Sequence, residues 1–159
     1  MAKMLVCYYS RTGHTQGMAE AVAKGARQVE GMTVDLKPVS DAGVTDLLGY
    51  DAIVIGSPTY YGTMAAEIKN LFDESVVFHG QLAGKVGGAF SSSANIGGGN
   101  ETTILDILKA MLIHGMVVIG SANGDHYGPV AIGAMDRRAE SQCVNYGKMV
   151  GRLAATLHP

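Results

Sequence analysis

The sequence lacks tryptophan altogether, and it has only three phenylalanines, four prolines and two cysteines among 159 residues. No apolar run approaches the ~20 residues that cross a bilayer, and the apolar start is too short for a signal peptide. We therefore expect a cytoplasmic protein without a membrane partner. Cys7 and Cys143 are far apart and form no C-x-x-C site. Cys7 lies in an apolar run, which favours a buried, inert thiol over a redox role.

Charge is also scarce. Charged residues make up 16% of the chain and the formal net charge is −2, so no basic surface is available for nucleic acid. No histidine pair has the spacing of metal ligands together with a carboxylate, and we predict no metal site. Hydrophobic residues reach 47%, which excludes disorder. The length predicts a single domain over residues 1–159.

Apolar runs alternate with helical patterns along the chain, which predicts an α/β fold with a parallel sheet and helices on both faces. The helical pattern at 101–113 predicts that Ile104, Leu105, Leu108 and Leu112 point inward. Residues 130–132 are expected to form a short strand that extends the fifth. The predicted strands are 4–9, 32–39 (an edge strand), 52–57, 85–92 and 116–120, and the predicted helices are 15–29, 46–48, 63–74, 101–113 and 135–157.

Unusual loops follow four of these strands. They are "SRTGHT", "SPTYYGTM", "SSSANIGGGNE" and "ANGDHYG". In open parallel sheets, ligands bind beyond the carboxyl ends of the strands, so these loops are expected to converge on one crevice.

The first loop has the chemistry of a phosphate site. Ser10, Thr12 and Thr15 offer hydroxyls, Gly13 permits a tight turn, and the helix that begins near His14 directs its N-terminus at the same point. The patterns G-x-x-x-x-G-K-[ST] and G-x-G-x-x-G are both absent, which weakens the common nucleotide and dinucleotide alternatives. The same residues also suit a simpler role in which Thr12 and Thr15 only cap the helix.

The spacing S-x-T-G-x-T resembles the phosphate loop of flavodoxin-like proteins that bind FMN. The segments "GSPTYYGTMAAEIKNLFDE" and "GKVGGAFSSSANIGGGNETTI", followed by "HGMVVIG" and "HYGPVAIG", resemble the WrbA-type NAD(P)H:quinone oxidoreductases. The resemblance covers nearly the whole chain. It implies a three-layer flavodoxin-like sandwich with a five-stranded parallel sheet of order 2-1-3-4-5.

The chain departs from that family in three ways. The usual insertion after the second strand is missing, and the segment between strand five and the Y-G element is shortened. The tryptophan usually found near the flavin is also missing, and Phe78 and His79 stand in that region instead.

The resemblance implies one non-covalent FMN. Tyrosines and close-approaching glycines suit its ring, and the amides of the glycine-rich loop suit the polar edge of the ring. The predicted cofactor-binding residues are Ser10, Arg11, Thr12, Gly13, His14, Thr15, Pro58, Thr59, Tyr60, Tyr61, Gly62, Ser91, Ser92, Ser93, Ala94, Asn95, Gly97, Gly98, Gly99 and His126.

Three residues are candidates to assist proton transfer, namely His114, His126 and Tyr127. His114 also suits a helix C-terminus, where a cation is favoured. The predicted activity is transfer of two electrons from NAD(P)H to a quinone or another small acceptor by a homo-dimer or homo-tetramer. The alternative is a flavodoxin-type one-electron carrier between redox proteins, although such carriers are typically strongly acidic around the flavin and this chain is not.

Overall fold

A parallel sheet forms the middle layer of the protein. The computed structural model describes all 159 residues. The strand order is β2-β1-β3-β4-β5, as predicted, and a sixth strand pairs with β4. The strands are β1 (Ala2–Tyr8), β2 (Met32–Pro38), β3 (Ala52–Pro58), β4 (Val86–Ser93), β5 (Val117–Val118) and β6 (Val130–Ile132).

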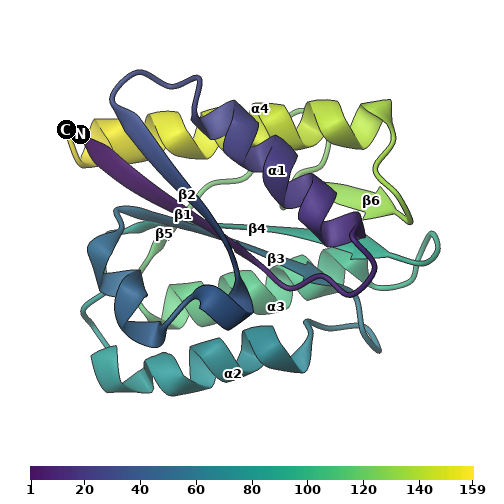
Figure 1. Ribbon diagram of the computed structural model, residues 1–159, viewed down its shortest axis with the longest axis horizontal. Coiled ribbons are helices and arrows are strands. Elements are labelled where there is room, and N and C mark those ends of the chain that lie inside the picture. The colour runs from purple at the N-terminus through teal and green to yellow at the C-terminus, as the bar shows by residue number, and fades with distance from the viewer.

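Helices cover both faces of the sheet. α1 and α4 lie on one face, and α2 and α3 lie on the other (Figure 1). None of the helices combines the length and the apolar character that a membrane-spanning segment requires. The α-helices are α1 (His14–Ala26), α2 (Ala66–Glu74), α3 (Asn100–Ile113) and α4 (Arg137–Leu157), and the 3₁₀ helices are η1 (Val39–Asp41), η2 (Val44–Gly49) and η3 (Ser75–Phe78).

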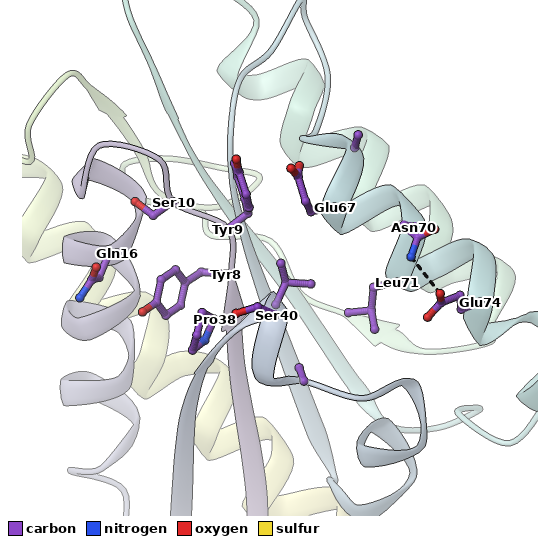
Figure 2. Close-up of a pocket in the computed structure, with 13 residues that line it drawn as sticks. Tyr8, Tyr9, Ser10, Gln16, Pro38, Ser40, Glu67, Asn70, Leu71 and Glu74 are labelled. Carbon is purple, nitrogen blue, oxygen red and sulfur yellow. Dashed lines mark hydrogen bonds between the residues drawn. The ribbon is translucent and has the colours of Figure 1, made fainter.

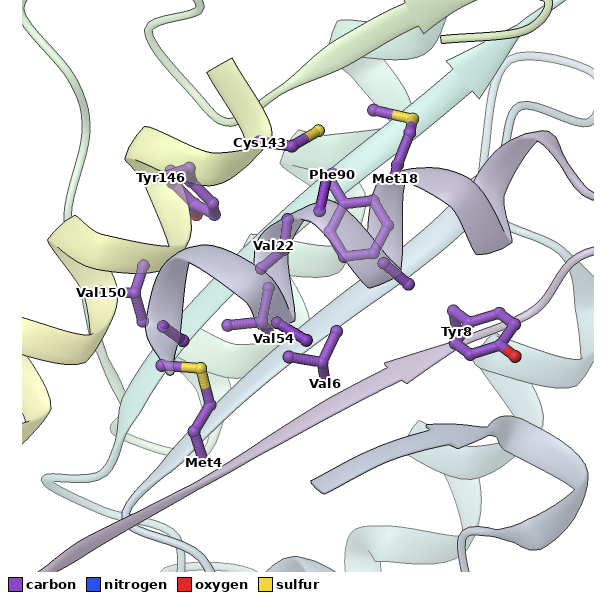
Figure 3. Close-up of a cluster of buried hydrophobic side chains, with 14 of the residues drawn as sticks. Met4, Val6, Tyr8, Met18, Val22, Val54, Phe90, Cys143, Tyr146 and Val150 are labelled. Carbon is purple, nitrogen blue, oxygen red and sulfur yellow. The ribbon is translucent and has the colours of Figure 1, made fainter. Parts of the chain in front are cut away.

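The central strands supply two cores because successive side chains point to opposite faces. Met4 and Val6 of β1 pack beneath α1 and α4 (Figure 3), whereas Leu5 and Cys7 pack beneath α2 and α3. Burial raises the pKa of the Cys7 thiol to about 12, with a smaller opposing effect from Lys37. The prediction of a buried Cys7 is confirmed, and a thiolate is disfavoured there.

The fifth strand position is occupied by two short strands. β5 pairs with Val86 and Gly87 at the start of β4, and β6 pairs with Ser91 to Ser93 at its end. The predicted strand at 116–120 is therefore only two residues long. Residues 130–132 do continue the fifth position, as expected, but they do so after an excursion at 119–129.

The predicted inward face of α3 is partly wrong. Ile104 is buried, but Leu105 and Leu112 are 38% and 54% exposed, and Ile107 and Met111 are buried instead. Apolar residues surround most of this helix, so their spacing did not single out the buried side.

Candidate functional site

The loop after β1 presents hydroxyls and free backbone amides at the start of α1. Gly13 occupies the N-cap position with φ of 93°, and no side chain caps the helix. The simpler alternative, in which Thr12 or Thr15 caps α1, is therefore excluded. Ser10 Oγ accepts from the Gly13 N–H at 3.1 Å, which leaves the Ser10 hydroxyl proton free to bond an anion. Arg11, Thr12, Gly13 and His14 are exposed.

This loop is anchored to the middle of the sheet by a buried hydroxyl pair. Thr15 is 2% exposed, and its Oγ1 lies 2.9 Å from Ser92 Oγ of β4. The first turn of α1 contains no acidic residue. Because the first amides of a helix have no partner within the helix and carry partial positive charge, this end of α1 suits an anion.

A hydroxyl network continues along the same edge of the sheet. Thr59 Oγ1 lies 3.0 Å from Ser91 Oγ, and Thr103 Oγ1 of α3 donates to Thr59 Oγ1 at 3.2 Å. Ser91, Ser92 and Ser93 belong to β4 and are buried. The predicted strand ended at residue 92, so β4 is one residue longer than predicted at this end. The role of Thr103 was missed, because nothing in the helical pattern marks it.

The loop after β3 makes a tight two-residue turn. Tyr60 and Thr63 exchange backbone hydrogen bonds of 2.9 and 3.2 Å, with Tyr61 (φ 48°) and Gly62 (φ 82°) between them. Two positive φ values are typical of a type I′ turn. Tyr61 is fully exposed, whereas the ring of Tyr60 packs edge-on against Tyr9 with a centroid distance of 6.3 Å. Pro58 and Thr59 are half-buried at the base of the turn.

The glycine-rich loop after β4 contacts this turn directly. A Cβ added to Gly99 would lie 2.9 Å from Gly62 Cα, and Thr102 Oγ1 donates to Gly62 O at 2.7 Å. The backbone N–H groups of Asn95, Ile96 and Gly97 donate to no other group in the chain. Ala94, Asn95 and Gly97 are exposed, and Gly98 and Gly99 are half-buried. This loop therefore presents several free donors next to the turn.

The excursion at 119–129 brings His126 and Tyr127 near the start of α3. Residues 124–128 and Glu101 line a common small cavity. Both predicted residues are exposed, and Tyr127 is 45% exposed. His126 Nδ1 lies 2.8 Å from the carbonyl of Ser121, so Nδ1 carries the proton and Nε2 is left free.

Asp125 holds this excursion in place. Its carboxylate accepts from the Val130 N–H at 2.9 Å and from Arg138 Nη1 at 2.9 and 3.1 Å. Arg138 also donates to the carbonyl of Val130 at 2.7 Å. No sequence pattern predicts this pairing, because the two residues are brought together only when α4 packs on the sheet.

The structure does not bring His114 to this edge. His114 follows the last residue of α3, and 14 helical residues span about 21 Å, so it lies near the opposite end of the sheet. Ser75 Oγ donates to Phe72 O at 2.7 Å, so His114 Nε2 donates to Ser75 Oγ, also at 2.7 Å. Burial, and secondarily the charge of His79, lower the pKa of His114. His114 Nδ1 has no partner.

A parallel sheet of this order, with a hydroxyl loop at the start of α1 and further loops gathered at the same edge, defines a flavodoxin-like protein. The family model described as NADPH-dependent FMN reductase matches residues 4–127, and the chain belongs to this family of oxidoreductases.

Known relatives and structures agree with this assignment. A protein named NAD(P)H dehydrogenase (quinone) from Rhodopseudomonas palustris (strain BisB5) is 44% identical over 142 residues, covering 76% of this chain and 71% of the relative. A protein of the same name from Nitrobacter winogradskyi is 37% identical and covers 99% and 100% of the two chains. That alignment has 199 positions, which is more than the 159 residues of this chain, so the relative has positions that this chain lacks.

Two solved structures have the same fold over nearly their whole length. The flavodoxin, WrbA-like protein from Agrobacterium tumefaciens is 29% identical with a TM-score of 0.84, covering 98% of this chain and 99% of that one. A flavodoxin from the domain Archaea is 25% identical with a TM-score of 0.81, covering 96% and 99%. The resemblance to WrbA-type proteins is confirmed.

Proposed function

We propose that this protein binds FMN without a covalent link and transfers two electrons from NAD(P)H to a quinone. The observation that carries the proposal is the gathering of a hydroxyl loop, free loop amides and two exposed tyrosines at one edge of the sheet. The names of the relatives support the choice of donor and acceptor.

The phosphate end of FMN fits the loop after β1. Ser10 has a free hydroxyl proton, Thr12 is exposed and makes no side-chain hydrogen bond, and the first turn of α1 holds no acid. In the Thr15–Ser92 pair, one hydroxyl donates its proton to the other, and the proton of the second hydroxyl remains free to bond the phosphate. The hydroxyls and the amides of α1 together would stabilise a dianion by hydrogen bonds and by the helix dipole, without a lysine.

The ring end of FMN fits the loops after β3 and β4. Asn95, Ile96 and Gly97 offer unpaired N–H groups for the oxygens and nitrogens of the polar ring edge. Ile96 and Tyr61 are 86% and fully exposed, respectively, so they are free to cover apolar parts of a flat ring. Bound flavin would supply the hydride and electron chemistry.

The side chains of this protein would then position reactants and move protons. His126 offers a free Nε2, and Tyr127 a hydroxyl, from a loop fixed by Asp125. The Tyr127 hydroxyl can donate a proton to the oxygen of an acceptor held beside the loop, and His126 can do so once Nε2 has taken up a proton from solvent. His114 lies near the opposite end of the sheet, so within one subunit it has no part in this scheme.

We also propose that the protein is a homo-dimer or homo-tetramer. Val76 and Val77 of η3 are 66% and 68% exposed, and Leu112 and Ile113 at the end of α3 are 54% and 72% exposed. Apolar side chains of this size are commonly covered when copies associate. Static light scattering is expected to give at least twice the mass of one chain, and a fully active monomer would contradict this part of the proposal.

Two measurements test the function. The purified protein should show the visible bands of oxidised flavin, and heat should release FMN. Stopped-flow mixing with NADH, and separately with NADPH, should bleach the flavin rapidly, and benzoquinone should restore it. If neither nucleotide reduces the flavin while dithionite builds up a stable one-electron form, the protein is instead a one-electron carrier.

A further inference from the structure

A small cavity beside the excursion at 119–129 collects polar groups that the proposed function does not use. The groove of about 810 Å³ against α2 shares Ser10 with the proposed phosphate loop, so it adjoins a site already described (Figure 2). The cavity beside the excursion has a volume of about 250 Å³ and lies between this loop and α4. Asn123 and Asp125 line it from the loop, and Gln142 lines it from α4.

Asn123 belongs to the only Asn-Gly pair in the chain. Of the five asparagines, no other one precedes a glycine. In any asparagine, the backbone nitrogen of the next residue can attack the carbon of the side-chain amide and close a five-membered ring. A side chain on that next residue obstructs the attack, and glycine has none. The sequence therefore makes Asn123 the most reactive asparagine of this chain.

The fold requires glycine at position 124. Gly124 has φ of 77°, which residues with a side chain rarely adopt. A Cβ added to Gly124 would also collide with the side-chain amide of Gln142. The packing of the loop on α4 therefore keeps an unobstructed backbone nitrogen next to Asn123.

Both reacting groups are free in the structure. The N–H of Gly124 donates to no group of the chain, and the side-chain amide of Asn123 makes no hydrogen bond. Asn123 and Gly124 are both exposed. Solvent therefore reaches the two groups, and no contact within the chain holds the side-chain amide away from the nitrogen.

Ser121 provides a hydrogen bond that favours the attack. Its Oγ donates to the carbonyl of Asn123 at 2.6 Å. This carbonyl and the N–H of Gly124 belong to one peptide unit, so the charge left when the nitrogen loses its proton spreads onto the oxygen that Ser121 bonds. Ser121 is itself fixed, because its N–H donates to the carbonyl of His126 at 2.9 Å and its carbonyl accepts from His126 Nδ1 at 2.8 Å.

We propose that Asn123 is a site of spontaneous deamidation, at which the loop promotes conversion of this asparagine to aspartate or isoaspartate. Hydroxide removes the proton of the Gly124 N–H, the nitrogen bonds to Cγ of Asn123, and the Cγ–Nδ2 bond breaks. The departing nitrogen takes a proton from water and leaves as ammonia. A second water then opens the ring at one of its two carbonyls. In sum, one water is consumed and one ammonia is released, and nothing is oxidised or reduced.

The product changes the loop that carries His126 and Tyr127. A carboxylate replaces a neutral amide in the cavity that already contains Asp125, and like charges repel. The isoaspartate form also lengthens the backbone of the loop by one atom. Because the released ammonia is lost to solvent, the modified fraction grows with the age of the molecule.

Peptide mapping by mass spectrometry tests the proposal. The protein as purified is incubated in neutral buffer, and each asparagine is followed for the mass change from amide to carboxylate. Asn123 is expected to convert at least about tenfold faster than the other four, because one hydrogen bond to the developing charge alone corresponds to about that factor. The same chain unfolded in urea is the reference. No conversion at Asn123 in the folded protein, over a time in which the unfolded chain converts, would overturn the proposal.

Variants of Ser121 test the part played by its hydroxyl. Ser121→Ala should slow conversion about threefold to tenfold, and Ser121→Thr, which keeps the hydroxyl, should restore it. Ser141→Ala removes an exposed hydroxyl of α4 outside the cavity and should leave the rate within about twofold. Circular dichroism checks that each variant is folded. Unchanged or faster conversion in Ser121→Ala would show that the hydroxyl does not promote the reaction.

The consequence for activity rests on the proposed function. Asn123→Asp carries the new charge permanently, and Asn123→Ser is the neutral control. The aspartate variant should be reduced by NADPH about twofold more slowly than the serine variant at low salt, because the added carboxylate repels an anionic nucleotide, and high salt should remove the difference. Equal rates at low salt would contradict this effect on activity. The peptide map needs neither flavin nor nucleotide, so it decides the modification even if the proposed function is wrong.

Discussion

The two halves of the proposed flavin crevice are built in different ways. The phosphate half comes from one short segment, 10–15, and the buried Thr15–Ser92 pair ties it to β4. The ring half comes from three separate loops. Gly99 lies against Gly62 and joins two of these loops, and Asp125 ties the third loop to Arg138 of α4. A local segment can therefore recognise the charged end of the cofactor, whereas recognition of the ring depends on tertiary packing. The following predictions separate the halves.

The largest effect is expected in the phosphate half. A hydrogen bond to a charged group contributes roughly 1.5–3 kcal/mol, so Thr12→Ala should weaken FMN about tenfold to a hundredfold, and Ser10→Ala/Thr12→Ala by roughly the square of that factor. Riboflavin lacks the phosphate and should bind the variants and the original chain equally. Titration of flavin-depleted protein with both flavins measures this, and parallel losses for the two flavins would show that the halves are not independent.

In the ring half, Gly99→Ala and Gly97→Ala form a matched pair. Both glycines have positive φ (103° and 70°), but only at Gly99 would a Cβ meet backbone, 2.9 Å from Gly62 Cα. Gly97→Ala should cost about 1 kcal/mol of unfolding free energy, whereas Gly99→Ala should cost about 2–3 kcal/mol and weaken FMN and riboflavin alike. Urea unfolding and flavin titration check both variants. Equal costs would mean that the contact between the two loops adjusts freely.

His114 lies outside both halves and provides a test of stability alone. Its pKa lies below the ordinary value of 6.5, so protonation favours the unfolded chain. The free energy of unfolding should be steady above about pH 7.5 and should fall as the pH drops below about 6.5. His114→Phe should reduce that slope, while FMN affinity stays the same. His126→Asn removes an exposed imidazole and serves as the control. If the pH dependence disappears in this variant and remains in His114→Phe, then His114 does not cause it.

The smallest effect is expected at Tyr61. A non-glycine residue at φ 48° is strained, and asparagine tolerates this region better. Tyr61→Asn should therefore stabilise the fold by about 0.5–1 kcal/mol, measured as a higher melting temperature. If Tyr61 covers the ring, riboflavin should bind the variant more weakly. Higher stability with unchanged riboflavin affinity would exclude Tyr61 from the ring half.

The same division explains what could be predicted from the sequence. The hydroxyl loop followed from a local pattern, because its residues are close together in the chain. The strand order followed from the resemblance to the family. Local patterns could not predict three other features. These are the exposure of Leu112, the shortness of β5 and the anchoring of Asp125 by Arg138. Each of these depends on which element packs beside it. His114 was predicted as a candidate for proton transfer, but within one chain the length of α3 separates it from that edge.

The divided fifth strand has a consequence for how this family can diversify. β5 and β6 each pair with their own part of β4, so the excursion between them, 119–129, contributes no strand to the sheet. Lengthening such a loop costs only about 0.6 kcal/mol for each doubling. Descendants of one ancestral sheet can therefore gain or lose residues beside His126 and Tyr127, and so change what approaches the crevice, while the registers on β4 remain intact.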